Sequence, residues 1–166
     1  MINPDSVARG EVRFNANGFD PNRQWDEVDL GGREWLQKNP EIWYVKKALV
    51  EQQARQPIAL ALNLHNTEMN EYMETMVADD VILPKMHRLF DTLLTTTTFD
   101  PSRPTLTLFS SGPANSTNSI WREAKIPMML MEQRIGAGRK LGHLVTTEER
   151  LEFGRKLIAA LAEAAR

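Results

Sequence analysis

Hydrophobic residues recur along this chain with two different spacings. Residues 58–65 alternate strictly, with isoleucine or leucine at every second position, which predicts a buried strand. Two shorter apolar segments predict further strands over residues 105–109 and 126–132. Apolar residues three or four positions apart predict helices over residues 39–56 and 83–97. Predicted strands and helices therefore alternate along the sequence.

Two local patterns mark where predicted helices begin. Asn39 followed by Pro40 is typical of an N-cap and a first helical position. Thr146 and Glu149 have the spacing of a capping box, which predicts a last helix from this point onward. The predicted buried faces are Ile42, Val45, Ala48 and Leu49 for the first helix, and Leu151, Leu157, Ile158 and Leu161 for the last helix.

The order of these elements predicts the fold class. Strands separated by helices indicate an α/β fold with a mixed, mostly parallel sheet flanked by helices. The 166 residues are about the size of one domain, and 42% hydrophobic with 25% charged residues is ordinary globular composition. We therefore predict a single domain over residues 1–166 with one hydrophobic core.

Charge and cysteine content exclude several classes of function. The formal net charge is −2, so the chain has no basic field that would attract nucleic acid or an anionic membrane. We expect neither as a partner. The absence of cysteine excludes a disulfide scaffold and every thiolate metal site, so a bound metal would need histidine and carboxylate ligands.

The sequence shows no targeting or membrane-spanning segment. Its first 14 residues lack the basic stretch followed by an apolar run that is typical of an export signal. No later stretch reaches membrane-spanning length. We expect the cytoplasm as the compartment, although a truncated chain would have lost such a signal.

One loop is unusually polar. Residues 13–25 contain two arginines, four asparagine or aspartate residues and one glycine. Gly18 permits a positive φ, and residues 20–22 favour a turn. On its own the stretch is typical of a solvated loop. The alternative is a binding loop in which Arg23 presents its planar guanidinium to a carboxylate, beside the amide of Asn22.

Two further candidate residues close predicted strands. His65 is the last residue of the strand over 58–65, and Glu132 is the last residue of the strand over 126–132. Ligands of α/β sheets collect at the carboxyl ends of the strands. A histidine at a strand end is more often structural, and a glutamate there is often where the chain meets water. Together with Arg23, however, they predict a site with a metal or base ligand, a carboxylate and an anion clamp.

Three motifs occur in an order that resembles a known family. RFNANGFDPNR at 13–23, LNLHNTE at 62–68 and MMLMEQR at 128–134 precede a long predicted C-terminal helix. This set resembles the zinc carboxypeptidases of the carboxypeptidase A type. INPDS at 2–6 is also similar to the Asn-Pro-Asp-Gly segment before the arginine loop of bacterial and cytosolic members, with Ser6 in place of the glycine. The resemblance covers most of the chain.

The resemblance implies a role for each matching residue. Asn22 and Arg23 would bind the free C-terminal carboxylate of a peptide, and Arg13 would polarise the scissile carbonyl. His65 matches the family's third zinc ligand. Glu132 matches the general base that takes a proton from the attacking water and passes it to the leaving amine.

The resemblance also leaves the zinc site incomplete. Asp20 matches a carboxylate that orients a zinc-binding histidine in the family. The first two zinc ligands of the family form a His-x-x-Glu pair upstream of the arginine loop, and this sequence has no counterpart, so the chain resembles the C-terminal half of such a domain. His65 and Glu68 repeat the His-x-x-Glu spacing and could form a replacement site with His87 or His143. Against this, His87 is typical of a helix boundary and His143 of a solvated loop.

Two other polar stretches allow simpler interpretations. Glu68, Glu71 and Glu74 are expected to form a solvated acidic segment. Residues 110–119 are either a flexible lid or part of a specificity pocket, as in the family, or only a polar loop.

The leading functional prediction is a zinc carboxypeptidase-like metallohydrolase that cleaves a C-terminal peptide bond or a related amide or ester. The first alternative is a noncatalytic module that binds peptide C-termini or small carboxylates. The second is an esterase without a normal zinc site. The apolar strand over 58–65 would leave a sheet edge uncovered, which predicts a homo-oligomer or pairing with a complementary N-terminal half.

Overall fold

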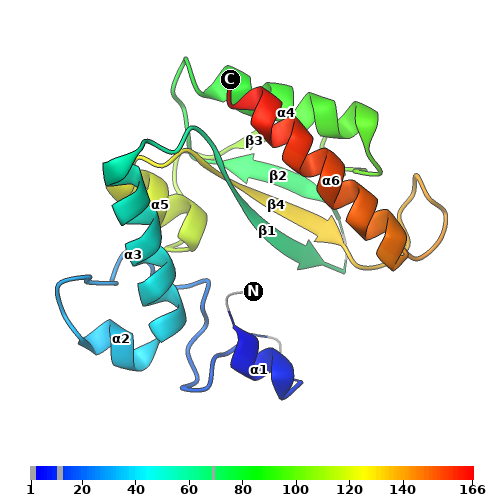
Figure 1. The fold of residues 1–166 in the computed structure, drawn as a ribbon. Helices are drawn as coiled ribbons and strands as arrows, with labels where there is room; N and C mark the ends of the chain where they lie inside the picture. The colour runs from blue at the N-terminus through cyan, green and yellow to red at the C-terminus, as the bar shows by residue number, and fades with distance from the viewer. Residues whose placement is uncertain (1–2, 11–12, 69) are drawn as a thin grey trace. The chain divides into compact units, whose positions relative to one another are not determined.

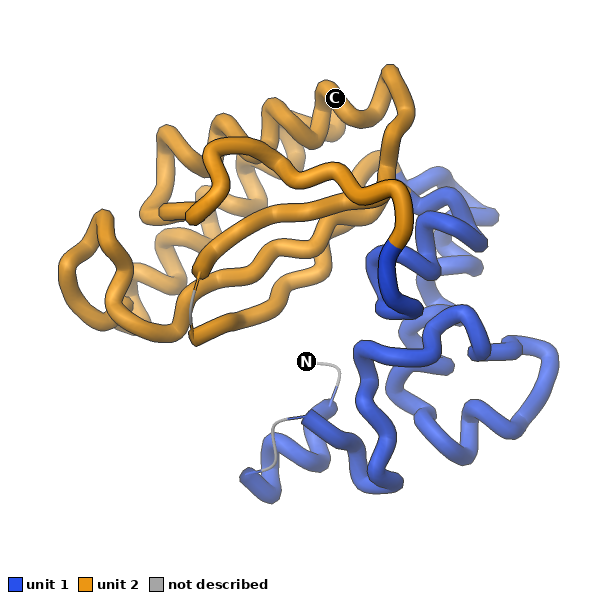
Figure 2. The backbone as a smooth tube through the Cα atoms, turned by 180° about the vertical axis from the view of Figure 1, so that it is seen from behind, with its two compact units in different colours: residues 1–58, 112–126 blue, residues 59–111, 127–166 orange. Residues whose placement is uncertain are grey.

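The computed structural model describes residues 3–10, 13–68 and 70–166 (Figure 1). The chain forms two compact units (Figure 2). Unit 1 consists of residues 1–58 and 112–126, and unit 2 consists of residues 59–111 and 127–166. No helix in the described ranges is both long enough and apolar enough to cross a membrane.

Unit 1 is helical. Its fully buried side chains include Trp25, Ile42 and Ile120, which form the centre of its core. The predicted N-cap is confirmed, because the Asn39 side chain accepts a hydrogen bond from the backbone N–H of Ile42. The helices of unit 1 are α1 (Pro4–Ala8), α2 (Glu34–Lys38), α3 (Pro40–Arg55) and α5 (Ser116–Ala124).

The buried face of α3 differs from the predicted one. Ile42 is buried as expected, but Ala48 is exposed and Lys46 is only 3% exposed. A hydrophobicity pattern places lysine on the solvent side. Here the Lys46 ammonium is buried because it finds oxygen acceptors on neighbouring segments, which offset the loss of hydration.

Unit 2 contains a four-stranded sheet in the order β1-β4-β2-β3. Its strands are β1 (Ala61–Thr67), β2 (Tyr72–Thr75), β3 (Thr107–Leu108) and β4 (Met128–Arg134). The β1–β4 and β2–β3 pairs are parallel, whereas β2 and β4 are antiparallel. The predicted mixed, mostly parallel α/β sheet flanked by helices is therefore confirmed.

Helices α4 (Leu83–Thr96) and α6 (Thr147–Ala164) lie side by side over one face of this sheet (Figure 1). The predicted capping box of α6 is confirmed, since Thr146 and Glu149 bond each other's backbone N–H groups. The predicted apolar stripe of α6 is confirmed at Leu157 and wrong at Leu151 and Ile158. Leu151 and Ile158 are 58% and 70% exposed, whereas the buried residues of α6 are Phe153, Leu157, Ala160 and Ala164.

The strands also differ from the prediction in detail. β1 begins three residues later than predicted, continues past His65 and is only partly buried. Among the described residues β1 pairs with β4 alone, so it is an edge strand rather than the buried strand that was predicted. β4 continues past Glu132, which therefore lies inside the strand. The predicted strand over 105–109 is reduced to two residues in β3.

Candidate functional site

The polar loop of unit 1 has a fixed conformation built around a buried asparagine. Asn15 is 3% exposed, and its Oδ1 accepts hydrogen bonds from the backbone N–H groups of Asn17 and Phe19. Its Nδ2 donates to Glu41 Oε2 at 3.0 Å. Gly18 has a φ of 81°, as its predicted turn position requires. The loop is thus shaped by its own polar groups.

Arg13 and Asp20 form an ion pair across this turn. Arg13 Nη2 lies 2.8 Å from Asp20 Oδ2, and the Asp20 side chain is 14% exposed. The other oxygen, Oδ1, accepts a hydrogen bond from the backbone N–H of Asn22 at 2.8 Å. Asp20 therefore orients Arg13 and the following backbone, whereas the family resemblance implied that it orients a histidine.

Asn22 and Arg23 follow directly. The Oδ1 of Asn22 accepts hydrogen bonds from both N and Oγ of Ser116 at the start of α5, each at 3.3 Å. Arg23 is exposed, and its Nη1 donates to the Asn22 carbonyl at 2.8 Å. Within the described part of the chain no carboxylate pairs with Arg23. Its guanidinium is therefore open to an anionic ligand.

The beginning of α5 corrects one prediction. Residues 110–119 were expected to form a lid, a pocket loop or a polar loop. Residues 110–115 form neither helix nor strand, but α5 starts at Ser116, capped by the side chain of Asn115, and residues 116–119 are buried. Their polar groups take part in hydrogen bonds at the start of α5 and with Asn22.

In unit 2 the predicted His65 and Glu132 lie side by side. They are register partners on β1 and β4, and Tyr72 of β2 is the partner of Glu132 on its other side. Register partners share a sheet face, so these three side chains form one row. His65 Nδ1 lies 3.8 Å from Glu132 Oε1, beyond hydrogen-bond length. Glu132 Oε2 is buried and has no hydrogen-bond partner among the described residues.

A second carboxylate lies on the same face. Glu74, two positions after Tyr72 on β2, is the partner of Leu130 and is half-buried. Burial raises the pKa of Glu132, and the nearby charge of Glu74 raises it further. Burial also raises the pKa of Glu74, with Arg103 acting in the opposite direction. For Tyr72, burial and then the charges of Glu132 and Glu74 raise the pKa.

Tyr72 and Glu74 were not predicted as site residues. The segment with Glu68, Glu71 and Glu74 was expected to be solvated, but Glu71 and Glu74 are partly buried and the strand β2 runs through it. The available signal was the alternation of Tyr72 and Glu74 with Met73 and Thr75. The acidic residues Glu71 and Glu74 obscured this alternation, because charged side chains are usually exposed to solvent.

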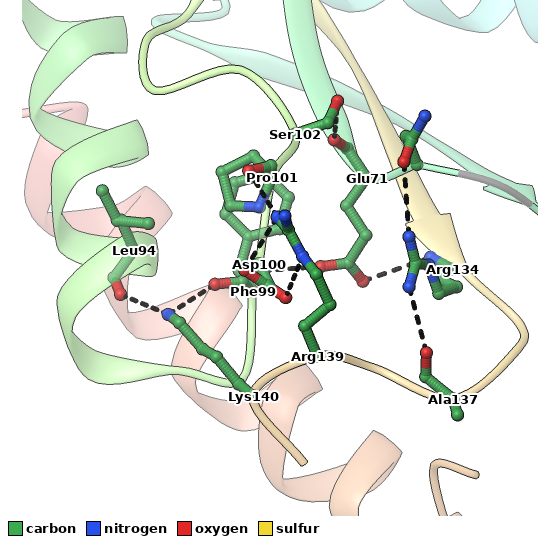
Figure 3. Close-up of polar contacts among 11 residues, drawn as sticks. Glu71, Leu94, Phe99, Asp100, Pro101, Ser102, Arg134, Ala137, Arg139 and Lys140 are labelled. Atoms are coloured by element: carbon green, nitrogen blue, oxygen red, sulfur yellow. Dashed lines mark hydrogen bonds and ion pairs between the residues drawn. The ribbon is translucent and has the colours of Figure 1, made fainter. Parts of the chain in front are cut away.

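Polar contacts fix the segments around the end of β4 (Figure 3). The Glu71 carboxylate accepts hydrogen bonds from the backbone N–H groups of Arg134 at 3.1 Å and Asp100 at 2.6 Å. Asp100 in turn binds the guanidinium of Arg139 through both oxygens. Lys140 donates to two carbonyls near the end of α4. The strand that carries Glu132 is thereby followed by an ordered segment.

The described residues do not fit a zinc shell. No group of three or more histidine, aspartate or glutamate side chains that could hold a metal occurs among them. Glu68 lies beyond the end of β1, which carries His65, and is exposed. His87 is exposed on α4, and His143 bonds Glu149. The replacement site built on His65 and Glu68 is therefore not supported.

Comparisons with known proteins relate this fold to hydrolases. No protein-family model and no curated protein matches the sequence. A metallo-carboxypeptidase from Burkholderia cenocepacia matches 98% of this chain over 42% of its own, with 16% identity and a TM-score of 0.72. A candidate carboxypeptidase A from Shewanella denitrificans matches 99% over 44%, with 20% identity and a TM-score of 0.73. Murine aminoacylase 3 matches 99% over 51%, with 16% identity and a TM-score of 0.58.

At such identities the likeness shows the fold alone. The chain spans less than half the length of the two carboxypeptidase structures. The predicted fold is confirmed: this is a mixed α/β fold that corresponds to part of a metallo-carboxypeptidase fold.

Proposed function

We propose that the chain supplies the carboxylate-binding and proton-accepting parts of a carboxypeptidase-like hydrolase. Its substrate would be a peptide, or a related amide or ester, with a free C-terminal carboxylate. The observation that carries this proposal is the pair of His65 and Glu132, held in register on neighbouring strands of a carboxypeptidase-type fold. The open guanidinium of Arg23 supports it independently.

Arg23 and Asn22 would bind the substrate carboxylate. A guanidinium offers two parallel N–H donors that match the two oxygens of a carboxylate, and such charge-assisted pairs are among the strongest hydrogen bonds in proteins. Asp20 already pairs with Arg13, so it does not compete for Arg23. Arg13 would stabilise the negative charge that develops on the scissile carbonyl oxygen.

Glu132 would accept the proton of the attacking water and deliver it to the leaving group. A general base works best when its pKa lies near the working pH. Burial and the charge of Glu74 both raise the pKa of Glu132, which moves it in this direction. Zinc is the expected metal of the related fold, and a zinc ion would need ligands beyond the described residues.

A noncatalytic module that binds peptide C-termini or small carboxylates is the second candidate. The absence of a metal-binding group from the described residues favours it. The Asn22–Arg23 clamp lies within unit 1 and needs no metal for its chemistry.

Hydrolysis of an N-blocked dipeptide, measured with and without added zinc, distinguishes the two candidates. The hydrolase proposal expects turnover that Glu132→Gln abolishes, because an amide cannot accept the proton. Glu148→Gln, an exposed carboxylate at the start of α6, is the matched control and should retain turnover. Binding of the free acid without any turnover would support the module. A chain that shows no turnover and no binding of the free acid would overturn both proposals.

A further inference from the structure

Unit 1 contains a buried lysine to which the proposed function assigns no role. Lys46 on α3 is 3% exposed. Lysine is almost never fully buried unless its charge is paired, because removing an ammonium group from water is costly. A buried lysine therefore needs oxygen acceptors that compensate for the hydration it loses.

All three N–H donors of Lys46 have an oxygen acceptor. Nζ donates to the backbone carbonyls of Trp25 and Val28 at 2.8 and 2.9 Å. It also lies 2.6 Å from Glu123 Oε2 on α5. Lys46 therefore joins the segment 25–28 to α3 and α5, all within unit 1.

This segment begins two residues after Arg23. Trp25 is fully buried, its Nε1 donates to the Pro21 carbonyl at 2.8 Å, and its backbone N–H donates to the Ala114 carbonyl at 3.1 Å. The stretch from Pro21 to Trp25 is thus closed on itself around Asn22 and Arg23. Gln24, between Arg23 and Trp25, has a φ of 61°, a conformation that needs support from its surroundings.

We propose that Lys46 is a positioning residue for the Asn22–Arg23 clamp, an inference that rests on the proposed carboxylate-binding function. Lys46 is buried and does not touch the ligand. It fixes the Trp25 and Val28 carbonyls, and through them the direction in which the Arg23 guanidinium points. A binding group that is already oriented loses less conformational entropy when the ligand binds.

The test replaces Lys46 with methionine in the full chain and leaves Arg23 intact. Calorimetry compares a C-terminal peptide as its free acid and as its amide. We expect Lys46→Met to weaken binding of the acid by about tenfold, roughly the effect of misplacing one charge-assisted bond, and to leave weak amide binding unchanged. Ile42→Val is the matched control, because Ile42 is fully buried one turn earlier on α3 and does not contact the loop through a polar group. It should keep the preference for the acid.

Hydrogen exchange supplies a readout that does not depend on ligand binding. The backbone N–H groups of Arg23 and Trp25 are bonded to Asp20 and Ala114. Lys46→Met should speed their exchange, while Ile42→Val should not. Unchanged exchange together with an unchanged acid preference would overturn the inference. If the wild-type chain shows no acid preference, the proposed function fails, and faster exchange would still identify Lys46 as the group that orders the loop.

If the Lys46→Met variant does not fold, Glu123→Gln is a second variant that tests the same inference. Glu123 is 37% exposed, so the chain tolerates this change more easily. It removes the charge that faces Lys46 and keeps a hydrogen-bond acceptor. A smaller loss of acid binding in the same direction supports the inference, and wild-type binding with wild-type exchange contradicts it.

Discussion

Replacing Glu132 with glutamine should stabilise the protein at neutral pH and not at pH 4. Burial and the charge of Glu74 raise the pKa of Glu132 in the folded chain above its unfolded value. The folded state therefore binds more protons than the unfolded state between these two pKa values, and stability falls as the pH rises through this window. Glutamine cannot ionise, so the variant escapes this loss.

The size of the effect follows from the surroundings of Glu132. A buried polar group without a hydrogen-bond partner costs about 1–3 kcal/mol, and a fully buried charged group costs more. The Glu132 side chain keeps 14% exposure, and Oε2 is its one fully buried oxygen without a partner among the described residues, so the lower end of this range applies. We expect a gain of about 1 kcal/mol at pH 7, which corresponds to a rise in Tm of roughly 2–4 °C for a chain of this size.

Thermal unfolding followed by circular dichroism at pH 4 and pH 7 measures this difference. Near pH 4 Glu132 is largely protonated, and the protonated acid and the amide are both neutral, so the variant and wild type should differ little. Asp80→Asn, an exposed carboxylate before α4, is the control and should show no comparable gain at pH 7. A variant that is less stable than wild type at pH 7, or equally stabilised at both pH values, would refute the burial cost assigned to Glu132.

Three further outcomes are expected. Arg23→Lys should weaken binding of a free-acid peptide by about 1.5–3 kcal/mol, roughly 10- to 150-fold, and leave binding of the peptide amide unaffected in calorimetry. Equal losses for the acid and the amide would show that the Arg23 guanidinium does not recognise the carboxylate. Thr146→Ala should lower the unfolding free energy by about 1 kcal/mol in urea, because the capping box of α6 is lost; an unchanged midpoint would contradict its contribution. The chain should self-associate through the edge strand β1, where Leu64 is 54% exposed, with little dependence on salt. Leu64→Lys should shift sedimentation toward the monomer, and a wild-type chain that is monomeric at every concentration would contradict this expectation.

The sequence alone determined the elements whose signals are local. The caps at Asn39 and Thr146 and the helical spacing of apolar residues predicted α3, α4 and α6. The alternation of strands and helices predicted the mixed, mostly parallel sheet. These features depend on residues a few positions apart, so the sequence displays them directly.

Tertiary structure decided which side chains are buried and what they face. Strand β2 was missed because Glu71, directly before it, and Glu74, within it, are acidic and yet partly buried. Distant segments supply the hydrogen bonds that Glu71 accepts. Lys46 is buried and Ala48 is not, because the acceptors of Lys46 come from a loop and from α5.

The features of the candidate site also fall into those that the sequence predicted and those that tertiary structure decided. The residue types and motif order singled out Arg23, His65 and Glu132. Their guanidinium, imidazole and carboxylate groups are typical of anion binding, metal or base chemistry and proton transfer. That Asp20 pairs with Arg13, and that the charge of Glu74 raises the pKa of Glu132, depended on the register of strands and the path of a turn. Electrostatic energies vary with distance and burial, and only the folded chain sets both.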